Sequence, residues 1–177
     1  MAPRSLVLLG ARPGHGKTLL GLELAAAAAS QRQAAFFFTL DYHAQDVEKQ
    51  LSDLGYLELV QDAALTVDTS DEVSSDYIIA RLQHAHPPAF AVIDYLQLLD
   101  QKRSNLPLEF QINALRMYAQ ETGAICIAIS QIDRAFDLSG RKMPSRSDVR
   151  LPNPLDLSLF DSFCFLHNGE IKVENPA

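Results

Sequence analysis

The chain has 177 residues, of which 47% are hydrophobic, and we expect a single globular domain over residues 1–177 with a full core. A net charge of −7 excludes a protein coated uniformly in basic surface for nucleic acid, and no apolar run reaches the roughly eighteen residues of a membrane span. Cys126 and Cys164 lie in apolar runs, which predicts buried thiols of a cytoplasmic protein and neither a disulfide nor a metal site.

Strand-like and helix-like segments alternate, which is typical of an α/β fold with a mostly parallel, twisted sheet and helices on both of its faces. We expect strands at 5–10, 34–40, 64–67, 89–94 and 124–130, and helices at 17–31, 44–54, 76–85 and 107–122. A long polar segment, 131–154, follows the last of these strands. Residues 160–166 and 170–173 predict a closing C-terminal hairpin around the Asn168-Gly169 pair.

The stretch "GARPGHGKT", between the first expected strand and helix, has the form of a phosphate-binding loop. Gly14 and Gly16 let successive backbone N–H groups point at the β-phosphate of a nucleotide. Lys17 reaches the β- and γ-phosphates, and the Thr18 hydroxyl ligates Mg²⁺. A chance glycine turn is the alternative. The expected nucleotide-binding residues are Ala11, Arg12, Pro13, Gly14, His15, Gly16, Lys17, Thr18 and Leu19.

Polar side chains end three of the expected apolar strands. Asp94, after "AVI", is expected to hold Mg²⁺ together with Thr18, unless it merely caps the next element. Asp41, after "FFFTL", is expected to polarise the attacking water, although it is also a candidate N-cap of the next helix. Gln131, after "IAIS", is expected to hydrogen-bond the γ-phosphate and report its loss, unless it is a simple polar strand end. The catalytic candidates are Lys17, Asp41 and Gln131.

Basic residues gather in one segment of an otherwise acidic chain. Residues 134–150 hold five of the 15 Lys and Arg against two Asp, so this segment carries +3 and the remainder −10. Contacts with a phosphate backbone are expected there, and a solvated surface loop is the alternative.

Taken together, these motifs resemble the RecA-type ATPase core, and specifically the C-terminal motor domain of DnaB-family replicative helicases. "GARPGHGKT" resembles that family's "ARPxxGKT", "FFFTLD" its "FSLEM" strand, "VIDYLQLL" its second acidic motif, and "AISQIDR" with "RKMPSRSDVR" its "SQLNR" and "RPxxSDLR" region. The resemblance implies a RecA-like P-loop NTPase fold, ATP with Mg²⁺, rings with ATP between subunits, and a segment after Gln131 that faces single-stranded DNA. The DNA-contact candidates are then Arg134, Arg141, Lys142, Arg146 and Arg150.

The chain departs from the family pattern in three ways. Asp41 stands where the family has Glu, so its carboxylate is one methylene shorter. Lys172 is the only Lys or Arg after Arg150, so the family's basic finger is expected to come from a partner or a second copy. The family's N-terminal domain and linker helix are not present in this sequence. We therefore expect weak or partner-stimulated ATP hydrolysis linked to DNA replication or recombination.

Two other interpretations remain. One is a nucleotide-dependent regulator or assembly factor with little or no hydrolysis. The other is a small-molecule kinase built on the same phosphate loop, although no arginine-rich lid is found and the "SQ" motif favours the helicase-like interpretation.

Overall fold

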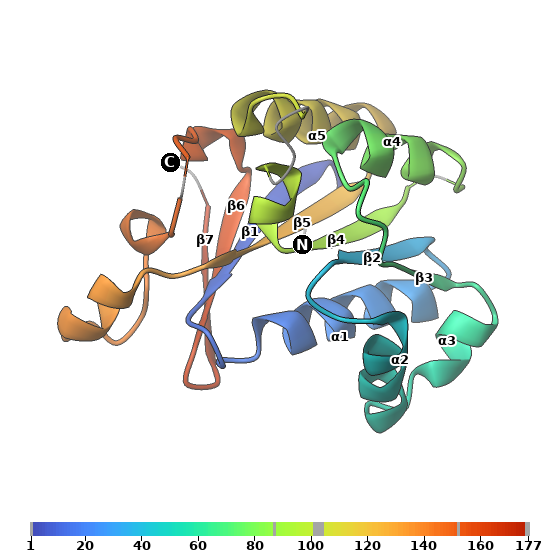
Figure 1. Cartoon of the computed structure of the whole chain (residues 1–177), viewed down its shortest axis with the longest axis horizontal. Helices are drawn as coiled ribbons and strands as arrows, with labels where there is room; N and C mark the ends of the chain where they lie inside the picture. Colours follow the sequence, from blue (N-terminus) through green and yellow to red (C-terminus); the bar gives the residue numbers. More distant parts are fainter. Residues whose placement is uncertain (1, 87, 101–104, 152, 176–177) are drawn as a thin grey trace.

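The centre of the protein is a seven-stranded sheet with the strand order β3-β2-β4-β5-β1-β6-β7 (Figure 1). The structure is a computed structural model that describes residues 2–86, 88–100, 105–151 and 153–175. The strands are β1 (Ser5–Ala11), β2 (Ala35–Thr39), β3 (Leu65–Asp68), β4 (Phe90–Asp94), β5 (Ile125–Gln131), β6 (Ser162–His167) and β7 (Glu170–Glu174). Every neighbouring pair is parallel except β6 and β7, so the expected α/β class is confirmed.

Helices cover both faces of this sheet, as Figure 1 shows. The α-helices are α1 (Lys17–Ser30), α2 (Ala44–Asp53), α3 (Leu57–Gln61), α4 (Ser75–Gln83) and α5 (Leu108–Thr122). The described residues also form the short 3₁₀ helices η1 (Leu96–Asp100), η2 (Arg134–Leu138), η3 (Arg146–Asp148) and η4 (Leu157–Leu159). The first three α-helices lie on one face, and α4 and α5 lie on the other.

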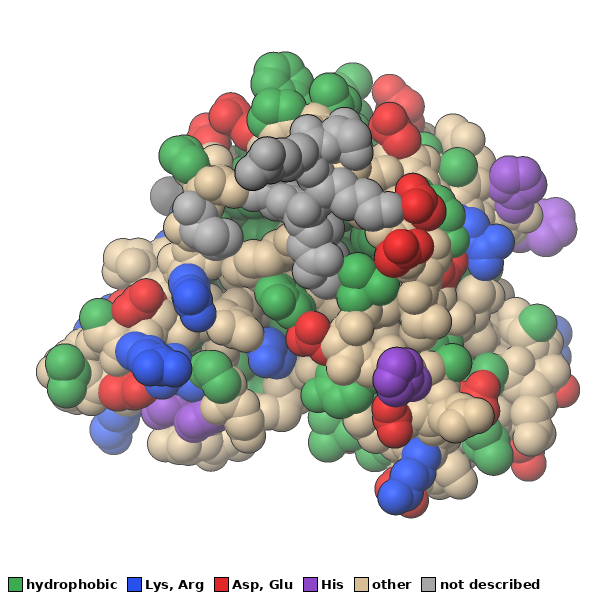
Figure 2. All heavy atoms as spheres, in the orientation of Figure 1, with side chains coloured by type: hydrophobic (Ala, Val, Ile, Leu, Met, Phe, Trp, Pro, Cys, Tyr) green, Lys and Arg blue, Asp and Glu red, His purple; other side chains and the backbone are tan. Residues whose placement is uncertain are grey.

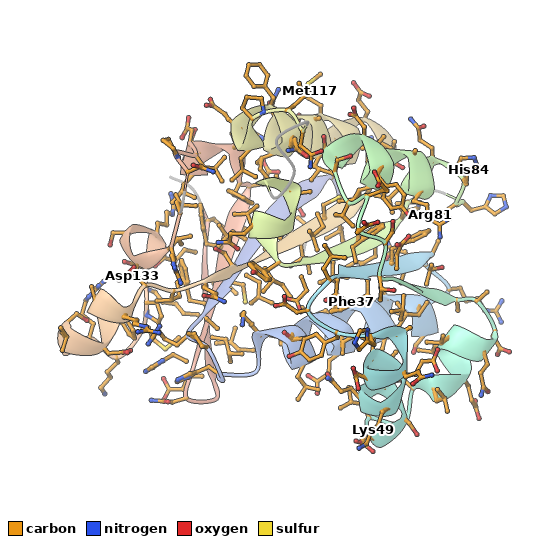
Figure 3. All side chains as sticks on the ribbon, in the orientation of Figure 1. Phe37, Lys49, Arg81, His84, Met117 and Asp133 are labelled. Atoms are coloured by element: carbon orange, nitrogen blue, oxygen red, sulfur yellow. The ribbon has the colours of Figure 1, made fainter. Side chains whose placement is uncertain are left out.

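Alternation along the buried strands produces two cores, one on each face of the sheet. In β1, Val7 and Leu9 join the core under α1, whereas Leu6 and Leu8 join the core under α5. Phe37 of β2 is fully buried on the α1 side (Figure 3). Because both faces are covered, the strands read as continuous apolar runs.

Several local expectations need correction. The helix α3 is not predicted from the sequence, because its five residues are too few to show a helical period. His43, and not Asp41, is the N-cap residue of α2, so the capping interpretation of Asp41 is wrong. The polar segment is not a plain loop, because it contains η2 and η3 and is joined back on itself by an antiparallel bridge between Ile132 and Val149.

Other expectations are confirmed. Cys126 and Cys164 are buried free thiols. The closing hairpin forms, with Asn168 and Gly169 at its tip in left-handed backbone conformations (φ 49° and 78°). None of the helices within the described residues is both long enough and apolar enough to span a membrane.

Gly21 of α1 lies directly against the sheet and provides a test of this packing. A Cβ atom at this position would approach Ile129 Cδ1 to 2.8 Å and Val92 Cγ1 to 3.1 Å. We expect Gly21→Val to lower the free energy of unfolding by about 1–3 kcal/mol, because the packed core must shift. Ala27→Val, at an exposed position of the same helix, is the matched control for denaturant unfolding. Equal losses in the two variants would contradict this account of the α1–sheet contact.

Candidate nucleotide-binding site

The expected site residues meet at the carboxyl edge of the sheet. Parallel pairing places Ala11, at the end of β1, beside Gln131, at the end of β5. The same register places Thr39, at the end of β2, beside Asp94, at the end of β4. In an open parallel sheet, ligands bind at this edge, outside the ends of the strands.

The loop between β1 and α1 folds tightly around two glycines. Gly14 and Gly16 have φ angles of 80° and 83°, in the left-handed region that glycine adopts without steric cost. The His15 N–H donates to the Arg12 carbonyl oxygen at 3.2 Å, and Gly16 is the N-cap residue of α1. The N–H groups and the positive end of α1 therefore open onto this loop, as they do at anion-binding helix N-termini.

Asp94 is the most constrained ionisable group of the site. Only 1% of this residue is exposed, and burial raises the pKa of its carboxyl to about 6, although a hydrogen bond with Thr18 and the charge of Lys17 act in the opposite direction. Its Oδ2 atom is buried and has no hydrogen-bond partner within the described part of the chain. A hydroxyl and a partnerless carboxylate oxygen, side by side, are oxygen donors that suit Mg²⁺.

Asp41 lies two residues beyond the end of β2, on the exposed side of the same edge. Its N–H donates to the Thr39 Oγ1 atom at 3.3 Å. Partial burial raises the pKa of the Asp41 carboxyl, and the charge of Lys17 lowers it. Because the charge of Asp41 in turn raises the pKa of Asp94, the two carboxylates and Lys17 are close enough to influence one another.

Gln131 links this edge to the basic segment that follows it. Its Oε1 atom accepts a hydrogen bond from Arg150 Nη1 at 3.4 Å, and its carbonyl oxygen accepts one from the Arg150 N–H at 2.8 Å. The neighbouring Ser130 is fully buried, and its hydroxyl has no partner among the described residues. A movement of the Gln131 side-chain amide would therefore alter its hydrogen bond with Arg150.

Two loop side chains make contacts that the sequence did not indicate. Arg12 forms an ion pair with Asp137 of η2 at 2.7 Å, and this guanidinium lowers the pKa of the Asp137 carboxyl. His15 stacks on His167 of β6, with ring centroids 4.7 Å apart. These partners lie more than a hundred residues away along the chain, and no local pattern marks them.

The five DNA-contact candidates fall into two groups. Three of them are held by other groups of the protein: Arg141 pairs with Asp148, Arg146 lies over the Phe163 ring and 3.7 Å from Glu174, and Arg150 bonds Gln131. The other two, Arg134 and Lys142, are exposed. Lys and Arg side chains gather over this part of the molecule, at the left of Figure 2.

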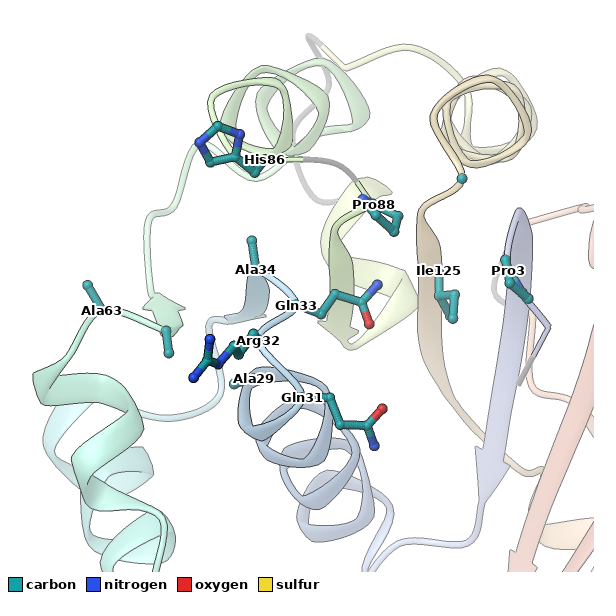
Figure 4. Close-up of a pocket in the computed structure, with 12 residues that line it drawn as sticks. Pro3, Ala29, Gln31, Arg32, Gln33, Ala34, Ala63, His86, Pro88 and Ile125 are labelled. Atoms are coloured by element: carbon teal, nitrogen blue, oxygen red, sulfur yellow. The ribbon is translucent and has the colours of Figure 1, made fainter.

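A separate cavity of about 700 Å³ lies at the opposite edge of the sheet (Figure 4). Residues that line it precede β1, β2, β3, β4 and β5, and include Arg32, Gln33, His86 and Gly123. This cavity is therefore at the amino ends of the strands and does not belong to the candidate site.

Comparison with known proteins identifies the family. Residues 48–156, which include β4, β5 and the segment with η2 and η3, match the model of the DnaB-like helicase C-terminal domain. The chain belongs to this family. A curated relative, the replicative DNA helicase DnaB of Leifsonia xyli, is 27% identical over 98% of the chain. The chain spans 45% of the length of that relative.

Solved structures of low sequence identity support the same fold. One, described as a DnaB-like replicative helicase and its interactions with primase, is similar over 98% of this chain and 54% of that chain, with 21% identity and a TM-score of 0.76. A KaiC-like protein of Pyrococcus horikoshii is similar over 97% of this chain and 76% of that chain, with 17% identity and a TM-score of 0.67. Both likenesses confirm the RecA-like architecture expected for the DnaB-like family.

The raised pKa of Asp94 predicts how stability depends on pH. Because its pKa in the folded protein (about 6) exceeds its ordinary value of 3.8, the folded state binds this proton more tightly than the unfolded chain does. The resulting stabilisation is complete below about pH 4 and is lost as the pH rises through 6, a change of about 3 kcal/mol at most. Without nucleotide and Mg²⁺, Asp94→Asn should therefore be more stable than the unchanged protein above pH 6.

Thermal unfolding across pH 4–8 measures this difference. Asp53→Asn, at an exposed position at the end of α2, is the control and should leave the shape of the pH profile unaltered. An Asp94→Asn variant that is less stable than the unchanged protein at pH 7.5 would contradict the argument.

Proposed function

We propose that this chain binds ATP with Mg²⁺ and hydrolyses it weakly, or with stimulation by a partner, as a DnaB-like ATPase domain that acts with single-stranded DNA in replication or recombination. One observation carries the proposal. The buried carboxylate of Asp94, at the mouth of a phosphate-type loop, hydrogen-bonds Thr18 and is influenced by the charge of Lys17, and its Oδ2 atom has no hydrogen-bond partner among the described residues. A divalent cation bound there would compensate for the otherwise unfavourable buried charge.

Each residue at the edge has a role in this proposal. Thr18 and Asp94 hold the Mg²⁺ ion, which when bound neutralises phosphate charge. Lys17 and the N–H groups of the loop bind the phosphates and orient the γ-phosphate. Asp41, on the open side of the edge, accepts a hydrogen bond from the attacking water. Gln131 hydrogen-bonds the γ-phosphate. When this phosphate is lost, the Gln131 amide moves and its hydrogen bond with Arg150 changes.

Weak hydrolysis follows from two features of the sequence. The Asp41 side chain is short for reaching a water molecule, and an error of about 1 Å in positioning costs about a hundredfold in rate. The second feature is that Lys172 is the only Lys or Arg after Arg150 in this sequence. A cation from a neighbouring subunit or a protein partner would therefore supply the arginine finger, which in related enzymes contributes roughly 10³–10⁵ in rate. Self-association and a cytoplasmic location are part of the same proposal.

Nucleotide binding is tested directly at Lys17. We expect Lys17→Ala to weaken the binding of a fluorescent ATP analogue with Mg²⁺ by about 10- to 100-fold, because a charged contact with the phosphates is lost. Lys49→Ala removes the same charge from an exposed position of α2 and is the control (Figure 3). Equal affinities for the two variants would place the nucleotide elsewhere.

Asp41 distinguishes a slow catalyst from a nucleotide-dependent regulator. If Asp41 positions the water, Asp41→Glu should raise the rate of ATP hydrolysis about tenfold or more, and Asp41→Asn should abolish it while nucleotide binding persists. A turnover near zero in all three proteins, with intact binding, would favour the regulator. Rapid turnover by the unchanged protein without DNA or partner would contradict weak hydrolysis.

Arg134 and Lys142 are the sharpest test of DNA binding, since neither forms an ion pair with any residue that the structure describes. Their joint replacement by Gln should weaken binding of single-stranded DNA and lower the slope of log affinity against log salt by about 1.4, from two lost phosphate contacts. The control is a double variant, Arg32→Gln with Lys49→Gln, which removes the same charge from exposed positions outside this segment. An unchanged slope would exclude these two residues as backbone contacts.

A further inference from the structure

Two segments that are distant in the sequence meet at the phosphate loop. Figure 1 shows the tip of the β6–β7 hairpin close to the turn between β1 and α1, and contacts of Asp137 with Arg12 and of Phe136 with His167 bring η2 to the same place. We name this meeting point the loop junction. Its members are Arg12 and His15 of the phosphate loop, Phe136 and Asp137 of η2, and His167 and Asn168 of the hairpin.

The first part of the loop junction is a two-pronged contact of Arg12. Its Nε and Nη2 atoms donate to the two carboxylate oxygens of Asp137 at 2.9 and 2.7 Å, and its Nη1 atom donates to the Ile132 carbonyl oxygen at 3.0 Å. Only 14% of the Arg12 side chain is exposed. All three nitrogens of the guanidinium are thus bound to the segment after β5, in the planar geometry that a carboxylate favours.

The second part is an aromatic stack around His15. The ring of His15 lies parallel to that of His167, at 9° between planes, and its Nδ1 atom accepts a hydrogen bond from the Asn168 N–H at 3.2 Å. Phe136, which is buried, meets the His167 ring edge-on at 5.1 Å. His15 of the loop is therefore packed against the hairpin tip, and the hairpin tip is packed in turn against Phe136 of η2.

From these contacts we infer that Arg12 and His15 are positioning residues, which hold the phosphate loop in its nucleotide-ready shape and do not bind the phosphates. This inference rests on the proposed nucleotide function. The two side chains flank Gly14, and Gly16 follows directly, so the clamp spans the part of the loop with the most backbone freedom. Holding such a loop in its bound shape removes an entropic cost of binding.

The arrangement also makes binding at two places interdependent. Asp137 lies in the same segment as Arg134 and Lys142, so a ligand that displaces η2 also releases Arg12. By linkage, a nucleotide that needs the clamped loop stabilises η2 to the same extent. The loop junction thus couples the phosphate loop to the basic segment through Asp137, in addition to the path through Gln131 and Arg150.

Asp137→Asn is the decisive variant, since Asp137 lies outside the phosphate loop and does not bind nucleotide in this account. We expect it to weaken the affinity for a fluorescent ATP analogue with Mg²⁺ about three- to tenfold, through the lost clamp on Arg12. The melting temperature without nucleotide should stay within about 2 °C of the unchanged protein, because an ion pair with a half-exposed carboxylate contributes little to global stability. Asp137→Glu, which retains the carboxylate, should restore most of the affinity.

Asp133→Asn is the matched control. It removes the same charge next to η2, and its side chain caps the Ala135 N–H, which Asn also does. Its affinity for the analogue should equal that of the unchanged protein. A fall in affinity for both Asp variants alike would mean that net charge, and not the clamp, is responsible, and would overturn the inference.

Two further outcomes separate the possible failures. If Arg12→Lys weakens binding while Asp137→Asn does not, Arg12 binds the phosphates itself and the positioning role is wrong. If the folded, unchanged protein binds no analogue at all, the proposed nucleotide function fails and the inference falls with it. If the unchanged protein binds and Asp137→Asn binds equally well, the inference alone is overturned.

Discussion

The buried carboxylate of Asp94 is the constraint around which the carboxyl edge is arranged. A charge withdrawn from water is costly unless neighbouring groups compensate for it. Here Lys17 and Thr18, both from the start of α1, act in that direction without restoring its pKa to the ordinary range. The charge of the Asp94 side chain therefore depends on the positions of the loop and the helix that bring these two residues to β4.

Strand order is what makes this meeting possible. After β1, the chain crosses the sheet through α1 and enters β2, which leaves β5 and β4 between them. Asp94 and Gln131 end these two central strands, so they lie between the phosphate loop on one side and Asp41 on the other. Adjacent parallel strands align their carboxyl ends, and side chains from four separate segments are thereby collected at one edge.

The hairpin and the segment with η2 and η3 form a second layer around that edge. Their contacts with the phosphate loop are polar and aromatic: a guanidinium with a carboxylate, and two stacked imidazoles. Phe136 meets the hairpin imidazole, that of His167, edge-on. Such contacts depend on the orientation of their groups as well as on buried area. Arg146 and Arg141, which face Phe163 and Asp148, extend the same layer away from the loop.

The sequence by itself determined the elements whose residues carry a strong local signal. The apolar runs of β1, β4 and β5, the long helices α1 and α5, the Asn168-Gly169 turn and the placement of Asp94 and Gln131 at strand ends all follow from periodicity and turn chemistry. Tertiary structure alone decided the strand order, the five-residue α3, and the partners of Arg12 and His15. For the loop partners the physical reason is distance along the chain: a contact between residues more than a hundred positions apart leaves no periodic trace and exists only after the sheet has assembled. For α3 the reason is length, because five residues are too few to show a helical period.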